Sequence, residues 1–460
     1  LGSMGYGYYL ALSVQNPVIA IMSFFLAVLL VILGTYLLFN AGTTVVLQLL
    51  KKKKNYYYKP NNMISISNLV FRMKKNAVGL ATIAILSSMV LVTLVGAASI
   101  YAGKKDYIAS VAPHDYSVTG TNVDLTSTQK IMDDFLAQSG NQVNEKAEVT
   151  YLYFGIKEQE KNKLTIFPEN ERKVLPKSIF LVFSQATYKQ LTGKDLNLAS
   201  NQVGLYSKSK TLKDQKSLSF NGQTYQIQDD LNDFIKGKVP NIFTIIVSDY
   251  NYLVVPDMDD FKESIKGTAT TQATYVGVNV KNPTHDAKKN SDLLDQMTDK
   301  ETQQLAGQNT GVSQSYLTAN SQYDTEGMLN GFVGGTLFIG IFLSIIFMLG
   351  TVLVIYYKQI SEGYEDRERF VILQKIGLDD LQVKQTIRKQ VLTVFFLPLI
   401  FAFIHLAFAY HMLSLIVRII GVFNPSLMLV VTIIVCGVFF LAYVLVFALT
   451  SRSYRRIVSM

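Results

Sequence analysis

Few side chains in this chain have the types and spacing that catalysis or metal binding requires. None of the four histidines has a second ligand at the spacing of a metal site: His114, His285, His405 and His411. The single cysteine, Cys436, cannot form an intrachain disulfide. The sequence supports no Ser/His/Asp set or carboxylate pair, and the phosphate-binding pattern of Gly, four residues and Gly-Lys-Ser/Thr is absent. The chain is therefore not predicted to be an enzyme.

One strongly charged segment, residues 356–398, lies between two long apolar runs. Phe370, Leu373 and Ile376 recur at a three-residue step among charged residues, which predicts a short amphipathic helix. Gly377 stands where a helix end requires positive φ, so a second helix is expected to begin directly after it and to run into an apolar span. Two interpretations remain open: a solvated loop, or a docking helix that transmits force from a soluble partner to the membrane.

The elements that position this segment are expected to be membrane helices. Of the 460 residues, 49% are hydrophobic and only 17% are charged, which is too apolar for an ordinary soluble protein. Five apolar runs reach about the 20 residues that a bilayer core requires. They cover residues 19–38, 77–100, 331–356, 391–416 and 427–449.

Basic residues in the short loops predict the orientation of these spans. Residues 51–76 contain eight Lys or Arg and no acidic residue, so the positive-inside rule places them in the cytoplasm. Alternation of the spans then places residues 104–330 and 418–426 outside, and residues 358–390 and 451–460 inside. The chain has a net charge of +9, and its basic residues cluster beside the apolar runs. This position favours anionic lipid over nucleic acid as their partner.

The predicted fold class is an α-helical membrane protein with five transmembrane helices and a large α+β extracellular domain inserted between the second and third helices. Strand and helix patterns alternate in the inserted segment. Within it, Asn221-Gly222 predicts a β-hairpin and residues 241–249 a buried strand. The predicted segments are the tail of a preceding span or external loop (1–16), helix (17–50), cytoplasmic basic loop (51–76), helix (77–103), extracellular domain (104–330), helix (331–357), cytoplasmic coupling-helix region (358–390), helix (391–417), external loop (418–426), helix (427–450) and cytoplasmic tail (451–460).

Small residues predict where two of these helices meet. Three glycines spaced by four begin the third span, a pattern that allows another helix to approach closely: Gly327, Gly331 and Gly335. The facing ridge predicted on the second span consists of Ala84, Ser88 and Gly96. The hypothesis is that the two helices that flank the inserted domain pack together and move it as one lever.

Two stretches resemble a known family. Residues 367–390, RERFVILQKIGLDDLQVKQTIRKQ, followed by an apolar run with Pro398, resemble the cytoplasmic segment of FtsX-like ABC transporter permeases. Residues 61–101, followed by an insertion of more than two hundred residues, resemble the C-terminal half of BceB-type permeases of Gram-positive bacteria. The resemblance covers essentially the whole chain, and it implies an N-terminal FtsX-like half that this sequence does not contain.

The resemblance also implies a separate ABC ATPase dimer, which would bind ATP and Mg²⁺ and dock on the cytoplasmic segment. The contact residues carried over from the family are Arg369, Phe370, Leu373, Ile376, Gly377 and Leu378. Glu362 and Glu365 would pair with basic residues of the ATPase, the alternative being a solvated face. Arg72 would contact the ATPase or a lipid phosphate, the alternative being simple snorkelling of its side chain to the interface.

The function that the resemblance implies is resistance to antimicrobial peptides and their sensing at the cell surface. The permease would protect the target of bacitracin- or lantibiotic-type peptides, or export them, by mechanotransmission from the ATPase to the extracellular domain. The implied partners are the peptide antibiotic or its complex with a lipid-linked wall precursor, and a sensor histidine kinase in the same membrane. Two alternatives remain: an FtsX-like regulator of a cell-wall hydrolase, and an exporter of lipoproteins or lipids. The size of the insertion favours the first function.

Overall fold

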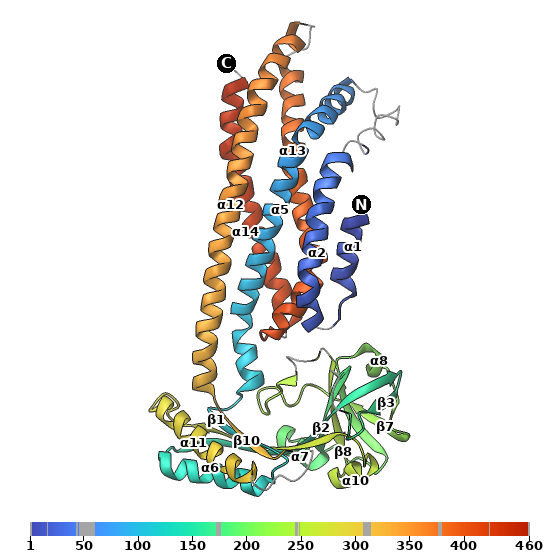
Figure 1. Ribbon diagram of the computed structural model, residues 1–460, viewed down its shortest axis with the longest axis vertical. Helices are drawn as coiled ribbons and strands as arrows, with labels where there is room; N and C mark the ends of the chain where they lie inside the picture. Colours follow the sequence, from blue (N-terminus) through green and yellow to red (C-terminus); the bar gives the residue numbers. More distant parts are fainter. Residues whose placement is uncertain are drawn as a thin grey trace. The chain divides into compact units, whose positions relative to one another are not determined.

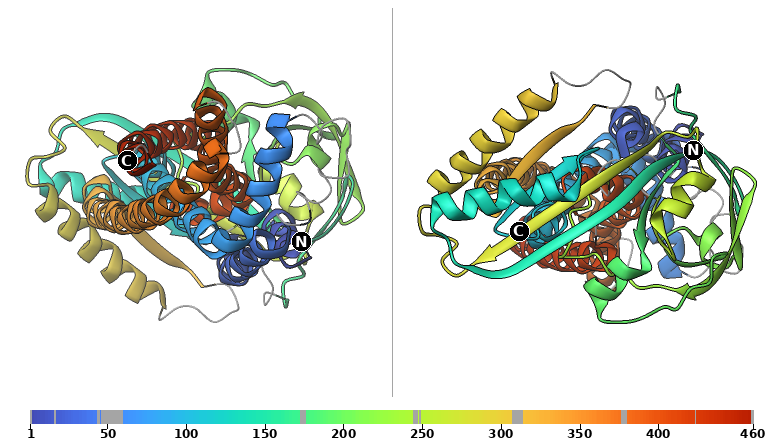
Figure 2. Two further views of the ribbon diagram at one scale, coloured as in Figure 1. Left: turned by 90° about the horizontal axis from the view of Figure 1, so that it is seen from above. Right: turned by 90° about the horizontal axis from the view of Figure 1, so that it is seen from below.

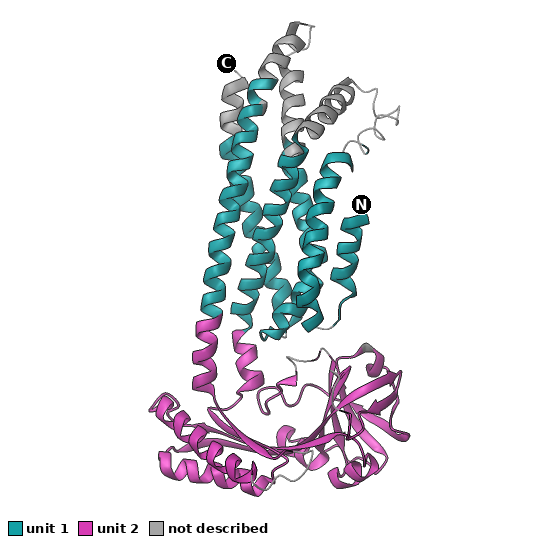
Figure 3. Cartoon of the chain, viewed as in Figure 1, with its two compact units in different colours: residues 1–103, 333–460 teal, residues 104–332 magenta. Residues whose placement is uncertain are grey.

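The computed structural model describes residues 2–15, 17–42, 45, 60–171, 176–243, 247, 249–306, 314–375, 380–422 and 424–458. Of these, residues 60–75, 210, 362, 366–391, 393–394 and 451–458 are described by their backbone alone. The chain divides into two units, coloured separately in Figure 3. Unit 1 comprises Leu1–Gly103 and Val333–Met460, and unit 2 comprises Lys104–Phe332.

Unit 1 is helical. Its helices are α1 (Gly2–Ser13), α2 (Pro17–Leu37), most of α5 (Pro60–Val111), most of α12 (Gln322–Lys375), α13 (Asp380–Ile419) and α14 (Pro425–Val458), and a π-helical turn (Leu38–Gly42) extends α2 (Figure 1). Within the described part of the chain, five helical segments are long and apolar enough to cross a membrane. They are Pro17–Ala41, Asn76–Val111, Gln322–Glu365, Phe395–Ile419 and Pro425–Thr450. Their number agrees with the five predicted spans.

Two helices in unit 1 are longer than predicted. The predicted basic loop at 51–76 is helical from Pro60 onward, because proline suits the first position of a helix and no Gly or Pro follows it before Gly79. The predicted short amphipathic helix around Phe370 is the end of α12, which continues without a break from Gln322 to Lys375 because no proline interrupts it. The predicted corner at Gly377 lies outside the described residues.

Small side chains dominate the helix contacts of unit 1. Ala77, Ala81 and Ala84 of α5 are buried in one cluster, and Ala11, Ala20 and Ala27 of α1 and α2 are buried in another. A Cβ on Gly34 would lie only 2.6 Å from the Cβ of Met4, so α1 and α2 nearly touch at their backbones. In lipid, close packing of this kind is a main source of helix association, because burial of apolar surface contributes little there.

Unit 2 begins and ends in a four-stranded antiparallel sheet of order β10-β1-β9-β2. The strands are β1 (Tyr116–Thr121), β2 (Val143–Glu160), β9 (Thr270–Val280) and β10 (Tyr316–Ser321). The helices α6 (Leu125–Ser139) and α11 (Ala287–Ala306) cover one face of it, and Figure 2 shows them beside each other. Phe135 of α6 and Leu294 of α11 share a core there with Val118 and Val276. This is the βαββαβ arrangement of ferredoxin-like folds.

A closed ring of strands is inserted between β2 and β9. Its order is β2-β3-β6-β7-β5-β8-β4, and pairing of β4 with β2 closes it. The strands are β3 (Lys163–Ile166), β4 (Ser178–Ser184), β5 (Gln202–Ser207), β6 (Ser217–Phe220), β7 (Gln223–Asp230) and β8 (Asp249–Val255), with α7 (Gln185–Thr192), α8 (Lys210–Lys213) and α10 (Met258–Ser264). Phenylalanines fill its interior, among them Phe154, Phe180, Phe220 and Phe261. The 18-residue β2 belongs to both the ring and the four-stranded sheet.

The inserted segment tests two local predictions. The hairpin is confirmed: β6 and β7 pair antiparallel, and Asn221 (φ 48°) and Gly222 (φ 96°) supply the positive φ angles of its turn. Of the buried strand predicted at 241–249, residues 244–246 and 248 lie outside the described residues; the described residues 241–243 and 247 are not in a strand, and β8 begins at Asp249. The apolar residues before it, such as Phe243 and Val247, pack on the ring without joining the sheet.

Candidate functional site

Unit 2 is joined to the two long helices through neighbouring strands. The last residues of α5 lead into β1, and β10 leads directly into α12. β1 and β10 pair antiparallel with Tyr116 opposite Ser321, and the backbone N–H of Gln322 donates to the carbonyl of Asp115 at 2.9 Å. The two helices therefore leave one sheet from adjacent positions, although some two hundred residues separate them in the sequence.

Asn320 connects the two helices beside this strand pair. Its Nδ2 donates to the carbonyl of Val111, the last residue of α5, at 3.0 Å. Its Oδ1 accepts from Thr325 Oγ1 in the first turn of α12 at 2.9 Å. Because the last carbonyls of a helix have no partners within the helix, Asn320 satisfies one of them and fixes the spacing of the two helix ends. About two turns before Val111 on α5, Lys104 Nζ donates to Asn330 Oδ1.

Serine side chains attach α11 to the start of α12. Asp324 N donates to Ser321 Oγ at 3.1 Å, and Ser321 Oγ donates to the Asp324 carboxylate at 2.9 Å. Ser291 of α11 lies 2.7 Å from Ser321 Oγ and also donates to the Asp324 carboxylate. These hydrogen bonds therefore connect the start of α12 directly to the helical layer of unit 2.

The turn from α5 into β1 contains a buried histidine. His114 is 3% exposed, and its Nδ1 lies 2.8 Å from Tyr275 Oη. It covers Gly277, where an added Cβ would lie 2.6 Å from the same nitrogen. Burial lowers the pKa of His114, and the charges of Glu145 and Asp115 oppose this shift only in part. Burial at this turn therefore favours the neutral form of the imidazole.

Within unit 1, α5 and α12 pack closely at Gly340. A Cβ at this position would lie 2.5 Å from the Cβ of Ala97. A second contact is at Gly350, where an added Cβ would lie 3.4 Å from Leu86 Cδ1. Ser344, four residues after Gly340, is buried on the same helix. Gly340 and Ser344 form a small-xxx-small pair, so the sequence did contain the signal for this contact.

The six small residues that the sequence singles out are not brought together. Among the described atoms, none lies within 4 Å of a Cβ built on Gly327, Gly331 or Gly335. On α5, Gly96 faces Leu413 of α13 at 3.6 Å from its Cβ position. Ala84 is buried in the cluster that contains Phe39, and Ser88 Oγ donates to the carbonyl of Ala84 within the helix. The pattern identified small residues correctly but could not say which face of each helix meets the other.

The predicted ATPase-coupling residues that the structure describes belong to the C-terminal part of α12 and the N-terminal part of α5. Arg369, Phe370 and Leu373 belong to the last two turns of α12, and Arg72 belongs to α5; all four are described by their backbone alone. Glu362 likewise has only its backbone described, whereas Glu365 is half-buried on α12. The remaining three lie outside the described residues: Ile376, Gly377 and Leu378. The role of this set stays a prediction.

Unit 1 also contains a buried polar contact among three helices. His405 of α13 is 5% exposed, with Nδ1 2.5 Å from Tyr8 Oη of α1 and Nε2 3.1 Å from Thr35 Oγ1 of α2. His411 Nε2 lies 2.9 Å from the carbonyl of Val14, which makes a second contact between α13 and the N-terminal helices. Both histidines therefore hold helices together. In the part of the chain that the structure describes, no three His, Cys, Asp or Glu side chains are placed to hold a metal ion.

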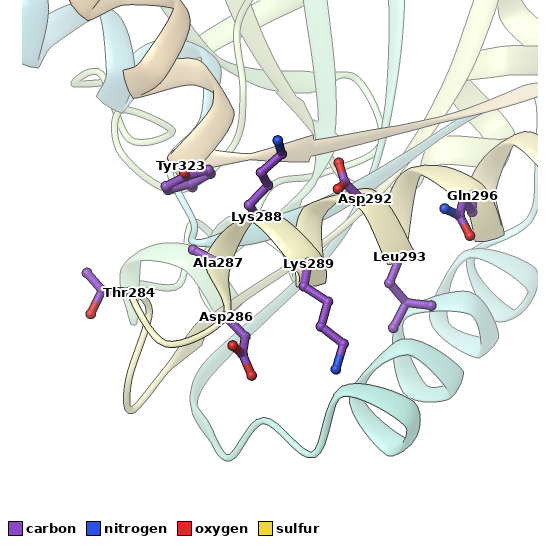
Figure 4. A pocket seen from close by; sticks show the side chains of 9 residues that line it. All are labelled: Thr284, Asp286, Ala287, Lys288, Lys289, Asp292, Leu293, Gln296 and Tyr323. Atoms are coloured by element: carbon purple, nitrogen blue, oxygen red, sulfur yellow. The ribbon is translucent and has the colours of Figure 1, made fainter.

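One shallow hollow of about 720 Å³ lies at the start of α11, next to Tyr323 of α12. Figure 4 shows that its charged side chains diverge: Lys288 and Asp292 point to one side of the helix, and Lys289 and Asp286 point to the other. Opposite charges that do not converge on one point select no particular ligand. The arrangement that stands out chemically is therefore the helix–strand junction and not this hollow.

Comparison with known proteins finds several similar relatives, of which three follow, although no protein-family model matches the chain. ABC transporter permease protein YxdM of Bacillus subtilis (strain 168) is 25% identical over 399 residues, which are 85% of this chain and 58% of the relative. Bacitracin export permease protein BceB of the same organism is 23% identical over 407 residues, 86% of this chain and 57% of the relative. BceB of Halalkalibacterium halodurans is 22% identical over 402 residues, which are 82% of this chain and 55% of the relative.

The chain spans a little more than half the length of the curated relatives it matches. The matched part covers most of this chain, and five of its helical segments have the length and apolar character of membrane spans. This combination indicates a membrane protein that is similar to transport permeases over most of its length. The chain is a relative of the BceB-type ABC transporter permeases.

Proposed function

We propose that this chain is part of the permease of an ATP-driven ABC complex that senses and resists peptide antibiotics at the surface of a Gram-positive bacterium. The observation that carries the proposal is the similarity over more than four-fifths of the chain to permeases, two of which are named for bacitracin export. Bacitracin-type peptides, alone or bound to a lipid-linked wall precursor, are the proposed ligands. A sensor histidine kinase is the proposed membrane partner.

Charge distribution supports a location of unit 2 outside the cell. Residues 104–332 contain 24 Lys or Arg and 28 Asp or Glu, whereas the rest of the chain contains 19 basic and only 6 acidic residues. Eight of those 19 basic residues are in the segment 51–76, between the first two apolar spans. The positive-inside rule assigns such a segment to the cytoplasm, and one further crossing then brings unit 2 outside.

The proposed mechanism is transmission of force along α5 and α12. A separate ATPase dimer would bind ATP and Mg²⁺ and act on the end of α12 at Arg369, Phe370 and Leu373. An unbroken helix of 54 residues is about 80 Å long, so a push at one end reaches the other without a hinge. The contact of Gly340 with Ala97 would make α5 follow α12, and Asn320 would pass the movement into the sheet of unit 2.

The proposal is tested by deleting the gene in its host and measuring the inhibitory concentrations of bacitracin, nisin and related peptides. We expect at least one peptide to inhibit at a several-fold lower concentration, and the complete gene supplied on a plasmid to restore resistance. As a matched control, the same plasmid is placed in a strain whose partner ATPase has a substituted nucleotide-binding lysine. This strain should stay sensitive. Unchanged inhibitory concentrations across the panel would contradict the proposal.

A further inference from the structure

The end of α5 has a second attachment in unit 2, apart from β1. The segment that joins β7 to β8 is described over residues 231–243 and 247. Its apolar side chains are buried against the outer face of the ring, next to Phe183 and Tyr188. They are Leu231, Phe234, Ile235, Val239 and Val247. The segment therefore moves with the ring and is not a free surface loop.

Asn241 connects this segment to α5. It is 4% exposed, and its backbone N–H donates to the carbonyl of Ser110 in the last turn of α5 at 2.7 Å. Its side-chain Nδ2 donates to Tyr252 Oη on β8 at 3.0 Å, and its Oδ1 accepts from the N–H of Phe243 at 3.2 Å. The side chain thus fixes the orientation in which the backbone N–H reaches the helix.

The polar contacts continue from Asn241 into the ring. Tyr252 of β8 is 2% exposed, and the charge of Asp233, in the same segment as Asn241, acts on its hydroxyl. Three residues after Asp233, Lys236 Nζ lies 3.8 Å from Asp106 Oδ1, one turn before Ser110 on α5. This ion pair is largely exposed and contributes little. The buried hydrogen bonds of Asn241 are stronger, because an unsatisfied polar group would remain if either partner were lost.

We infer that Asn241 is a positioning residue that transmits movement between the ring and α5, in parallel with the β1–β10 strand pair. The inference rests on the proposed mechanical function. Its reason is topological: β1 is not a strand of the ring, and the contacts of the described segment 231–243 with α5, at Asn241 and at the exposed Lys236–Asp106 pair, bypass β2 and the four-stranded sheet. Through these contacts the ring acts on α5 directly, whereas the serine contacts of α11 act on α12.

The attachment is tested by disulfide crosslinking of the full-length protein in membranes. Cysteines replace Asp106 and Lys236 in a background with Cys436→Ser, and the rate of crosslinking reports how closely the segment is held to α5. We expect Asn241→Ala to lower that rate about five-fold, the factor that corresponds to one buried hydrogen bond. Asn201→Ala, an exposed residue before β5, is the matched control and should leave the rate unchanged.

Tyr252→Phe provides a second variant that removes the same side-chain contact from the other partner. Because the hydrogen bond that Tyr252→Phe removes is one of the two that Asn241→Ala removes, the double variant should lower the rate no further than Asn241→Ala alone. If Asn241→Ala fails to fold, Tyr252→Phe still decides the question. A rate equal to that of the control in the variants that fold would overturn the inference.

Bacitracin resistance of cells that carry the same variants tests the transmission itself. We expect Asn241→Ala and Tyr252→Phe to lower the inhibitory concentration several-fold at unchanged protein amount, and Asn201→Ala to have no effect. If the variants crosslink slowly but keep full resistance, the attachment transmits no movement; the inference is then overturned and the proposed function stands.

If the unsubstituted strain shows no resistance, the proposed function is overturned. The crosslinking rates still decide whether the attachment exists, because they do not depend on resistance.

Discussion

At the scale of single residues, unit 2 holds two titratable side chains whose burial favours the neutral form. Burial raises the pKa of Asp233, although Lys208 and the Tyr252 hydroxyl act in the opposite direction. Burial lowers the pKa of His114. Asp233 lies in the same segment as Asn241, and His114 lies in the turn between α5 and β1. The stability of unit 2 at different pH values therefore depends on residues near the ends of the long helices.

Replacing Asp233 by Asn should stabilise unit 2 at neutral pH. The folded pKa of Asp233 is raised, so its contribution to stability is fully present below the unfolded value of about 3.9 and is lost as the pH rises through the folded pKa. The amide carries no charge and avoids this loss. Thermal unfolding of the full chain in detergent should show a higher melting temperature for the variant at pH 7, with no gain at pH 3.5. A variant that melts lower at pH 7 would contradict this reading of the site.

His114 should make unit 2 sensitive to mild acid. Because its folded pKa is lowered, its contribution to stability is present above the unfolded value of about 6.5 and is lost as the pH falls below that value. We expect the melting temperature to drop between pH 7 and pH 5, and His114→Gln to flatten this dependence. His285, which is exposed, provides the control: His285→Gln should keep the full pH dependence. Identical curves for His114→Gln and the unsubstituted chain would exclude His114 as the cause.

At the scale of elements, the decisive contact is that of α5 with α12 at Gly340. Replacing Gly340 by Val should push the helices apart and destabilise unit 1 by about 1–3 kcal/mol, the usual cost of overpacking. Gly334→Val, on the same helix with no described atom near its Cβ position, should cost far less. Thermal unfolding compares the two variants.

A rescue experiment makes the contact specific. Gly340→Ala alone should destabilise unit 1, because the new methyl group would lie 2.5 Å from that of Ala97. Gly340→Ala combined with Ala97→Gly moves the methyl group from one helix to the other and should recover most of the lost stability. Strictly additive destabilisation by the two changes would show that these residues do not meet.

Local patterns predicted many elements of this fold but not their pairing. The hairpin at Asn221-Gly222 and the helices α6, α7, α10 and α11 follow from turn chemistry and periodicity, which depend on neighbours in the sequence. The pairing of strands in the ring does not follow from such local patterns. β4 pairs in parallel with β8, some seventy residues later, and short strands such as β3 have no clear pattern in the sequence. At 241–249 the apolar run indicates burial, and the described residues Phe243 and Val247 pack against the ring outside any strand.

The attachments at the helix ends were beyond prediction for a further reason. Asn241 and Asn320 are single polar residues in stretches without a motif, and each acquires its role only when a distant helix end presents an unpaired carbonyl. The glycine ridge at Gly327, Gly331 and Gly335 shows the opposite case. The glycine spacing was visible in the sequence, but α12 contacts α5 at Gly340, on another face of α12.

At the scale of the whole molecule, the proposed orientation has a direct test. In a Cys436→Ser background, a cysteine at Asn221, at the tip of the hairpin, should react with a membrane-impermeant maleimide on intact cells. A cysteine at Lys52 should react only after lysis, because its segment is assigned to the cytoplasm. Labelling is read from protein gels. Protection of Asn221 on intact cells, or labelling of Lys52, would reverse the assignment.

The adjacency of β1 and β10 has a consequence for the way such proteins diversify. Because Tyr116 lies opposite Ser321, everything between these strands departs from and returns to one narrow place on the sheet. The ring is inserted in the same manner between β2 and β9. Evolution, or a protein engineer, can therefore exchange the ring for another module without altering the distance between the two long helices. A chimaera that carries the ring of a relative should then fold with the two long helices at an unchanged spacing.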